Sequence, residues 1–338
     1  MIEDDPLTEV ERGPLRPPSE ARSLLIRVVR NCPWNRCAFC PAYKGEKFLV
    51  RPINEVLNDI RHLALNPDTH LAKTAFLQDA DALIAPTDTL LRILQTIKQT
   101  LPGIERITTY TRSNTLSHLP TEALKSLREA GLSRIHVGIE SHCDEVLKMI
   151  QKGTTPQKQI EGCLHAKEAG LELCCYVMPG VGGKRFSEQN AIETGRFVAK
   201  IEPNHVRLRT CFVLEDTPLA NDFNKGLFEP LSEEETVREI RLFLTQLAHA
   251  KTELICDHRI NLLLELRGSL PEQYDQLIGI IDRFLALSAE SKKQFIAGRR
   301  MGLIRRIDEL FDPDKKSQLE EAALNYKAIV PIPKGVLY

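Results

Sequence analysis

The stretch SLLIRVVRNCPWNRCAFC, residues 23–40, joins a run of strand-forming residues to a loop with three cysteines. Its first eight residues are largely apolar or β-branched, at the length of a buried strand. The loop that follows carries Cys32, Cys37 and Cys40 within nine residues. Three thiolates this close together repel one another unless a cation binds them, so we interpret the loop as a metal site.

The number and spacing of these cysteines favour an iron–sulfur cluster over zinc. A structural zinc site takes four ligands, usually from two CxxC-type pairs. This chain has one group of three cysteines, with neither a second CxxC nor an HxxxH motif elsewhere. Three protein ligands on a four-iron cluster leave one iron open to another molecule. Zinc, or a loop without metal, remains the alternative at this point.

Composition and charge restrict the class of protein. The 338 residues are 42% hydrophobic, and the formal net charge of −1 does not indicate a nucleic-acid or membrane surface. No apolar run approaches the roughly 18–20 residues that span a bilayer. The acidic, proline-rich start is unlike a signal peptide, so we expect a cytoplasmic protein with reduced cysteines and no membrane partner. We expect buried, inert thiols at the other six cysteines: Cys143, Cys163, Cys174, Cys175, Cys211 and Cys256.

A strand–helix alternation begins at residue 23. The expected strands are SLLIRVVR (23–30), TAFLQ (74–78), IERITTY (104–110), RIHVGIE (134–140), LELCCYVMPG (171–180) and HVRLRTCFV (205–213). Helical periodicity follows each of the first five, which predicts parallel strands joined by right-handed crossovers. The fold class we predict is α/β, a partial (β/α)6 TIM-type barrel with a helical C-terminal region. A flat doubly wound sheet is the alternative.

The pattern divides the chain into three parts. We predict an N-terminal extension at 1–22, the partial barrel at 23–230 and a helical C-terminal region at 231–338. From 231 to 325 the sequence indicates helices only, including INLLLELRG at 260–268. In a barrel of this kind the chemistry lies at the C-terminal ends of the strands, where the cysteine loop is expected.

The cysteine loop resembles that of the radical S-adenosylmethionine (radical SAM) superfamily. Its spacing is CxxxxCxxC, one residue longer in the first gap than the common CxxxCxxC. Further similar segments are FLQDADAL (76–83), HVGIESHCDEVLKMIQKG (136–153) and YVMPGVGGK (176–184). Together they resemble a branch related to oxygen-independent coproporphyrinogen oxidase and the Elongator-type catalytic subunit. The resemblance implies a [4Fe–4S] cluster on Cys32, Cys37 and Cys40 that binds S-adenosylmethionine.

The same resemblance implies further cofactor-binding residues. Phe39 and Met178 would lie near the adenine, Asp81 would hold the amino group with Asp79 sharing or replacing it, and Glu140 with Ser141 would bind the ribose. The alternatives are solvated loop acids for the aspartates, a structural salt bridge for Glu140 and ligand-free turn glycines after Met178.

Two arginines in the sixth strand and one later histidine are the candidate catalytic residues. Arg207 and Arg209 lie two residues apart and therefore on the same face of that strand, where buried guanidinium groups require anionic partners. A cofactor carboxylate, an acidic substrate or Glu140 could supply the charge, and pairing with surface acids is the alternative. His258 lies in DHRIN (257–261), which we expect to face substrate. The alternative there is a helix that begins at Asp257 as N-cap.

The resemblance implies an enzyme that cleaves S-adenosylmethionine reductively to a 5′-deoxyadenosyl radical, which abstracts hydrogen from a substrate. The substrate is unknown, with a small and anionic molecule as the candidate class. The electron would come from an external donor such as flavodoxin or ferredoxin, since no second cluster motif is visible. The lack of an all-β RNA-binding module after the barrel disfavours tRNA methylthiolation, and the balanced charge makes nucleic acid an unlikely partner. A non-catalytic iron–sulfur or haem-binding protein on this fold, and a zinc-stabilised nucleic-acid-binding module, are the rival interpretations.

Overall fold

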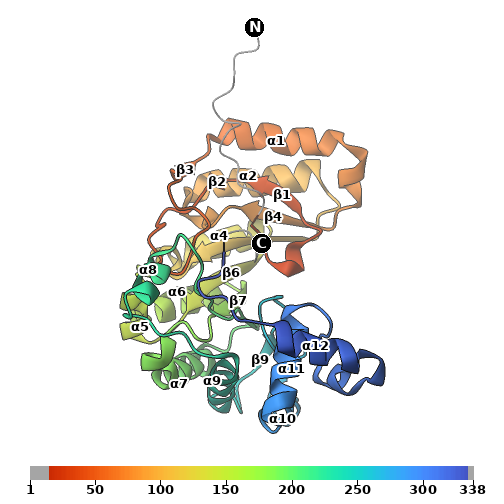
Figure 1. Cartoon of the computed structure of the whole chain (residues 1–338). Helices are drawn as coiled ribbons and strands as arrows, with labels where there is room; N and C mark the ends of the chain where they lie inside the picture. Colours follow the sequence, from red (N-terminus) through yellow and green to blue (C-terminus); the bar gives the residue numbers. More distant parts are fainter. Residues whose placement is uncertain (1–14, 334–338) are drawn as a thin grey trace. The chain divides into compact units, whose positions relative to one another are not determined.

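The computed structural model describes residues 15–333, which form two compact units (Figure 1). The first unit contains the described residues up to Arg36, together with Ala42–Gly138 and Gln157–Cys174. The second contains Cys37–Pro41 and Ile139–Pro156, and continues from Cys175 onward. The cysteine loop therefore contributes residues to both units.

The first unit is built on parallel strands with helices between them. β1 (Leu24–Arg27), β4 (Thr74–Gln78), β5 (Arg106–Arg112) and β6 (Leu132–Glu140) pair in that order. β4 is buried almost throughout, as expected for a parallel strand covered on both faces. The short antiparallel pair β2 (Val29–Arg30) and β3 (Leu49–Val50) brackets the cysteine loop. The helices between and after these strands are α1 (Ile53–Leu65), α2 (Thr87–Thr100), α3 (Ser113–Ser117), α4 (Thr121–Ala130) and α6 (Pro156–Glu168).

The second unit carries the later strands and most of the C-terminal helices. β7 (Glu172–Val177) enters from the first unit, β8 (His205–Leu208) is parallel to β9 (Thr252–Ile255), and β10 (Arg267–Leu270) is antiparallel to β9. Its helices are α5 (Asp144–Met149), α7 (Gly183–Ile201), α8 (Pro218–Asn224), α9 (Glu233–Thr245), α10 (Tyr274–Leu285), α11 (Ala289–Arg300) and α12 (Lys316–Asn325). None of the helices in the described ranges is both long and apolar enough to cross a membrane.

The α/β prediction with a helical C-terminal region is confirmed, but the region from 231 to 325 is not purely helical. β9 and β10 lie inside it, and the predicted helix at 260–268 is instead an irregular segment that leads into β10. Short apolar runs such as INLLL fit a helix and a buried irregular segment equally well by periodicity. The predicted domain boundaries at 22/23 and 230/231 remain predictions.

A buried carboxylate in the first unit ties the segment before β1 to two other strands. Glu20 is fully buried and accepts hydrogen bonds from Ser23 Oγ at 2.6 Å and from Arg106 Nη2 at 3.1 Å. His136 Nε2 lies 3.5 Å from Glu20 Oε1. Burial raises the pKa of Glu20, but hydrogen bonds with His136 and Ser23 and the charge of Arg106 outweigh it and lower the pKa to about 2. His136, which is fully buried beside Glu20, is therefore a core histidine.

The low pKa of Glu20 predicts a stability contribution that depends on pH. A carboxylate whose pKa is lowered in the folded state stabilises it above the unfolded value of 4.5, and that contribution is lost as pH falls toward 2. Glu20→Gln should lower the free energy of unfolding at pH 7 by about 3 kcal/mol, at about 1.4 kcal/mol per pKa unit. Urea titrations at pH 7 and pH 3 measure the difference, which should shrink in acid.

The exposed pair Lys73–Glu105 offers a matched control in the same unit. Glu105→Gln should change the free energy of unfolding by less than about 1 kcal/mol at either pH, because exposed ion pairs contribute little. An effect of Glu20→Gln that is equally large at pH 7 and pH 3 would show that packing, and not charge, accounts for the role of Glu20.

Candidate active site

The cysteine loop is held in place by its own backbone. Asn31 and Asn35 adopt left-handed conformations, with φ of 67° and 48°, which asparagine tolerates better than most residues. Asn35 N donates to Cys32 Sγ at 3.5 Å. In the second unit, Ala38 N donates to Ile150 O at 2.8 Å, and Ala38 O accepts from Leu219 N at 3.0 Å. Main-chain bonds at Ala38 thus anchor the part of the loop that lies between Cys37 and Cys40.

The donor set of this loop fits an iron–sulfur cluster. None of the nine cysteines forms a disulfide, and Cys32, Cys37 and Cys40 are each partly exposed. No histidine or carboxylate lies between Cys32 and Cys40 in the sequence, so thiolates are the ligands that this segment offers. Five of the other six cysteines are buried, as predicted, and Cys211 is partly exposed. Burial raises the pKa of Cys256 to about 12, which keeps this thiol protonated.

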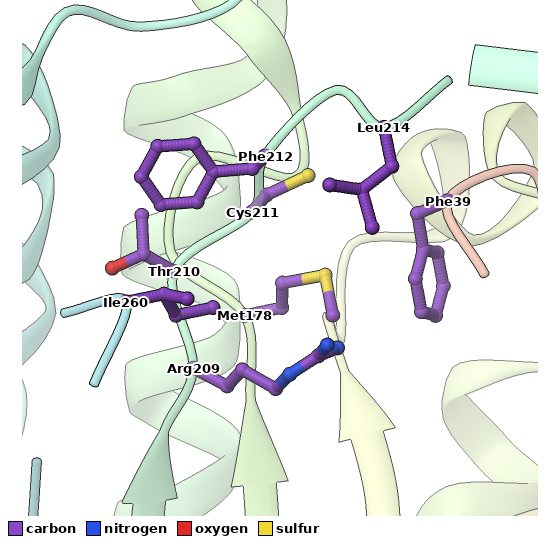
Figure 2. A pocket seen from close by; sticks show the side chains of 8 residues that line it. All are labelled: Phe39, Met178, Arg209, Thr210, Cys211, Phe212, Leu214 and Ile260. Atoms are coloured by element: carbon purple, nitrogen blue, oxygen red, sulfur yellow. The ribbon is translucent and has the colours of Figure 1, made fainter. Parts of the chain in front are cut away.

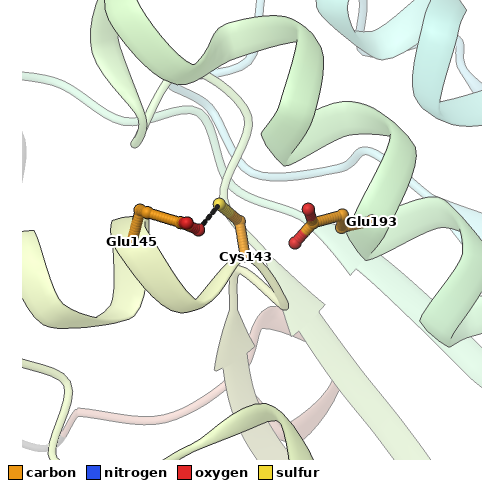
Figure 3. Close-up of side chains that lie close together, drawn as sticks. All are labelled: Cys143, Glu145 and Glu193. Atoms are coloured by element: carbon orange, nitrogen blue, oxygen red, sulfur yellow. Dashed lines mark hydrogen bonds between the residues drawn. The ribbon is translucent and has the colours of Figure 1, made fainter.

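A second group with possible metal ligands lies in the second unit and is explained without a metal. Cys143, Glu145 and Glu193 bring a thiol and two carboxylates within 4.8 Å of one another (Figure 3). The side-chain amide of Gln189 donates to both carboxylates, at 3.0 Å and 2.9 Å, and Cys143 Sγ donates to Glu145 at 3.3 Å. Burial, the first cause, raises the pKa of Cys143 to about 11. We therefore assign no metal to this group.

The two aspartates after β4 have different surroundings in the first unit. Asp81 is fully buried and accepts from Thr111 Oγ1 at 2.9 Å, Thr115 Oγ1 at 2.5 Å and Arg112 N at 3.3 Å. Burial raises the pKa of Asp81 despite these bonds. Asp79 accepts from Asn31 N at 3.0 Å, directly before Cys32, and lies 3.5 Å from Arg27 Nε. Asp81 thus fixes the end of β5, whereas Asp79 lies against the start of the cysteine loop.

Glu140 ends β6 in a left-handed conformation and pairs with a lysine that the sequence analysis missed. Lys152 Nζ lies 2.9 Å from Glu140 Oε1, so the structural salt bridge considered as the alternative is present. The same ammonium group lies 5.9 Å from the centroid of the Phe39 ring. Ser141 is buried, and its hydroxyl accepts from Cys143 N at 3.0 Å. The twelve-residue separation of Glu140 and Lys152 carries no periodicity that could have revealed this pair.

A pocket in the second unit brings three of the predicted residues together. Phe39, Met178 and Arg209 line it, and Figure 2 shows the Arg209 side chain extending past Met178. The remaining lining residues are Thr210, Cys211, Phe212, Leu214 and Ile260. The pocket is thus mostly apolar with one cationic side chain. Among the described residues, no carboxylate hydrogen-bonds to the Arg209 guanidinium or forms an ion pair with it.

Main-chain hydrogen bonds join the strand ends that build the pocket. Met178 N donates to Glu140 O at 2.8 Å, Arg209 N to Val177 O at 3.0 Å, and Cys211 N to Pro179 O at 2.8 Å. These bonds hold the residues after β6, β7 and β8 side by side. The C-terminal ends of the strands therefore form the site, as the barrel prediction requires.

A buried glutamate fixes the loop after β7. Glu239 of α9 accepts from Gly180 N at 2.8 Å, Asn190 Nδ2 at 2.9 Å and Ser187 Oγ at 2.5 Å. Burial raises the pKa of Glu239 in spite of these hydrogen bonds. The sequence contained a signal for it, because Glu239 lies on the apolar face of its helix, four residues before buried Phe243.

Arg207 and Arg209 have different environments. Arg207 is buried, and its Nη1 donates to both carboxylate oxygens of Asp257 at 3.0 Å. Asp257 is exposed, so Arg207 pairs with a surface acid, which was the alternative given for it, and Asp257 is not a helix N-cap, because no helix begins there. Within the described part of the chain, the pocket lining includes Arg209 but neither Arg207 nor His258. Of the two arginines, Arg209 alone is therefore placed to meet a ligand in this pocket.

His258 lies in a turn that arginines and an asparagine hold against β8. Asn261 Oδ1 accepts from Thr210 N at 2.9 Å, and Asn261 Nδ2 donates to Leu208 O at 2.8 Å. Arg299 Nη2 and Arg300 Nη1 of α11 donate to the carbonyls of Asn261 and Ile260 at 2.9 Å and 2.8 Å. Burial, followed by the nearby arginines, lowers the pKa of His258 to about 4. The imidazole is therefore neutral at pH 7 and suited to hydrogen bonding.

Just over half of the chain, residues 26–195, matches the family model described as the radical SAM superfamily. The chain belongs to the radical SAM superfamily. The superfamily prediction is confirmed, and with it the partial (β/α)6 TIM-type barrel and the cofactors, a [4Fe–4S] cluster and S-adenosylmethionine. Radical SAM proteins are enzymes that act on a substrate and require an electron donor.

Curated relatives of this radical SAM protein are distant. The tRNA uridine(34) acetyltransferase of Methanocaldococcus infernus is 23% identical over 62% of this chain and 46% of its own length. The chain therefore spans about half the length of this relative. The uncharacterized protein YtqA of Bacillus subtilis is 21% identical over 66% of this chain and 68% of its own length.

Solved structures support the fold. The cobalamin-dependent S-adenosylmethionine radical enzyme OxsB covers 90% of this chain and 55% of its own, with a TM-score of 0.52 and 13% identity. Coproporphyrinogen III oxidase (HemN) from Escherichia coli covers 68% of this chain and 54% of its own, with a TM-score of 0.50 and 16% identity. At these identities the likeness concerns the fold alone.

The Arg207–Asp257 pair predicts an asymmetric response to mutation. The side chain of Arg207 is 5% exposed and that of Asp257 is 35% exposed. Asp257→Ala leaves a buried guanidinium without its partner and should lower the free energy of unfolding by about 3 kcal/mol. Arg207→Met leaves a carboxylate that water can reach, so a loss of about 1–2 kcal/mol is expected. Urea unfolding measures both, and an equal or reversed ranking would contradict the assigned burial of the pair.

Proposed function

We propose that this protein uses S-adenosylmethionine and a [4Fe–4S] cluster on Cys32, Cys37 and Cys40 to abstract hydrogen from an anionic substrate. The observation that carries the proposal is the pocket in which Arg209 lies beside Phe39 and Met178. An aromatic ring and a thioether suit the flat, apolar face of an adenine. A guanidinium without a protein carboxylate at the same pocket suits a carboxylate or phosphate.

When bound, the reduced cluster and S-adenosylmethionine would supply a 5′-deoxyadenosyl radical for hydrogen abstraction. The chain's own residues would bind and orient S-adenosylmethionine. Asp79 is our candidate for the cofactor's amino group, because it lies against the start of the cysteine loop, where it accepts from Asn31 N, whereas Asp81 is fully buried at the end of β5. Glu140 would bind the ribose with Lys152 holding its carboxylate in place. The hydrogen bond that the Ser141 hydroxyl accepts from Cys143 N stabilises the turn after Glu140.

Arg209 and His258 would differ in what they offer a substrate. Arg209 would pair with an anionic group through bidentate hydrogen bonds. His258, neutral at pH 7, would accept or donate a hydrogen bond and would not act as an acid. Arg207 would position the segment that carries His258 through its bonds with Asp257.

A nucleic acid is the second candidate substrate, favoured by one observation. Two archaeal relatives named tRNA uridine(34) acetyltransferases align over 62% of this chain. A phosphate of RNA would satisfy Arg209 as well as a small carboxylate would. The near-neutral charge of the chain gives less support to nucleic acid, because such binding draws on many cationic contacts.

Anaerobic incubation of the reconstituted protein with dithionite and S-adenosylmethionine tests the proposed function. We expect 5′-deoxyadenosine from the native protein, and at least tenfold less from Cys37→Ala, measured by liquid chromatography. Arg209→Met should keep this uncoupled reaction within about twofold, because it leaves the cysteines and Asp79 in place. A cluster-loaded protein that forms no 5′-deoxyadenosine would contradict the proposal and favour the non-catalytic alternative.

The substrate class is tested in the same assay by addition of total tRNA or of a low-molecular-weight metabolite fraction. The fraction that raises 5′-deoxyadenosine formation contains the substrate, and Arg209→Met should abolish that rise. If Arg209→Met instead loses the uncoupled reaction while it stays folded and loaded with iron, Arg209 belongs to the cofactor site and the assignment to substrate is wrong.

A further inference from the structure

The only tryptophan of the chain lies in the cysteine loop and contacts two arginines. The guanidinium carbons of Arg36 and Arg112 each lie 5.2 Å from the centroid of the Trp34 ring, within the range of a cation–π contact. Trp34 and Arg112 are partly exposed and Arg36 is exposed. All three belong to the first unit. An aromatic side chain at the surface is thus surrounded by positive charge.

The loop between β2 and β3 is cationic in a chain that is otherwise nearly neutral. Residues 31–48 contain Arg36, Lys44 and Lys47 against one carboxylate, Glu46. Lys44 Nζ donates to Asn35 O at 2.8 Å, so this ammonium group lies over the turn that carries Trp34. With Arg112 from the end of β5, four cationic side chains belong to this part of the first unit. We refer to Trp34, Arg36, Lys44 and Arg112 as the Trp34 surface.

The Trp34 surface belongs to the turn that carries a cluster ligand. Cys32 precedes Trp34 by two residues, and its Sγ accepts from Asn35 N at 3.5 Å. An electron bound for the cluster can therefore arrive next to this turn. Tryptophan and arginine are the side chains most enriched among energetically dominant interface contacts, and electron-transfer encounters need only a small interface.

We propose that the Trp34 surface is the docking site for an acidic one-electron carrier protein of the flavodoxin or ferredoxin class. The proposal rests on the proposed function, because a protein that does not cleave S-adenosylmethionine reductively needs no electron carrier. Each encounter transfers one electron: the carrier is oxidised by one electron and the cluster-loaded enzyme is reduced by one. No proton or chemical group moves between the proteins. Opposite charges on the two partners raise the association rate and make it depend on salt.

A second explanation of the same charges is that they offset the negative thiolates of the cluster loop. The two explanations differ in what a charge reversal changes. Loss of a docking contact weakens carrier binding and leaves the cluster's reduction by a small reagent intact. Loss of an electrostatic offset shifts the cluster's reduction potential and affects every reductant.

The test uses Arg36→Glu and Trp34→Phe with Arg92→Glu as matched control. Arg92 is an exposed arginine on α2 of the same unit, outside the Trp34 surface. Three quantities are measured for each reconstituted protein. They are the Kd for a bacterial flavodoxin at low and high salt, the initial rate of 5′-deoxyadenosine formation with flavodoxin hydroquinone or dithionite, and the midpoint potential of the cluster.

We expect Arg36→Glu to weaken flavodoxin binding about tenfold or more at low salt, and much less at high salt. The flavodoxin-driven rate should fall in parallel, while the dithionite-driven rate stays within about twofold. Trp34→Phe should give a smaller loss, and Arg92→Glu should match the native protein in every measurement.

Three outcomes would overturn the proposal. Equal behaviour of Arg36→Glu and Arg92→Glu places the docking site elsewhere. A shifted potential with equal losses for flavodoxin and dithionite shows that the charges tune the cluster. A native protein that binds no flavodoxin also contradicts it. By contrast, failure of dithionite to yield 5′-deoxyadenosine contradicts the proposed function, while the binding measurement still reports on docking.

Discussion

Three thiolates on one nine-residue loop impose the constraint on which the rest of the site depends. Such a loop is stable in its ionised form only around a cation, and it offers three ligands where a closed zinc site takes four. The protein meets this constraint with main-chain bonds at Ala38 and with two left-handed asparagines. The middle of the loop is therefore anchored by main-chain bonds at Ala38, the residue between the cluster ligands Cys37 and Cys40.

The ends of the strands carry buried charges that the protein satisfies itself. Glu140 pairs with Lys152, Arg207 with Asp257, and Asp81 accepts bonds from two threonines and a backbone amide. Each of these groups would be costly to bury without its partner. Arg209, in the pocket, forms no such ion pair among the described residues. This difference is the reason why we propose Arg209 as the side chain that pairs with an anionic substrate.

Much of the fold and the location of the site could be predicted from local sequence. β-branched runs and helical periodicity predict the alternation, and the cysteine spacing predicts the cluster. The features that the sequence did not reveal involve either an ambiguous pattern or a contact between residues far apart in the sequence. The run at 260–268 fits a helix by period, yet its second residue, Asn261, donates to Leu208 O of β8 and accepts from Arg299 of α11. The partner of Arg207 lies fifty residues away, and no spacing rule connects them.

The central claim is that Cys32, Cys37 and Cys40 hold a [4Fe–4S] cluster that binds S-adenosylmethionine. It is tested most directly by electron paramagnetic resonance of the anaerobically reconstituted, dithionite-reduced protein, before and after S-adenosylmethionine is added. A reduced-cluster signal that changes on addition, and that is absent when all three cysteines are replaced by alanine, is the predicted result. Stoichiometric zinc without iron, or a cluster signal that S-adenosylmethionine leaves unchanged, would contradict the claim.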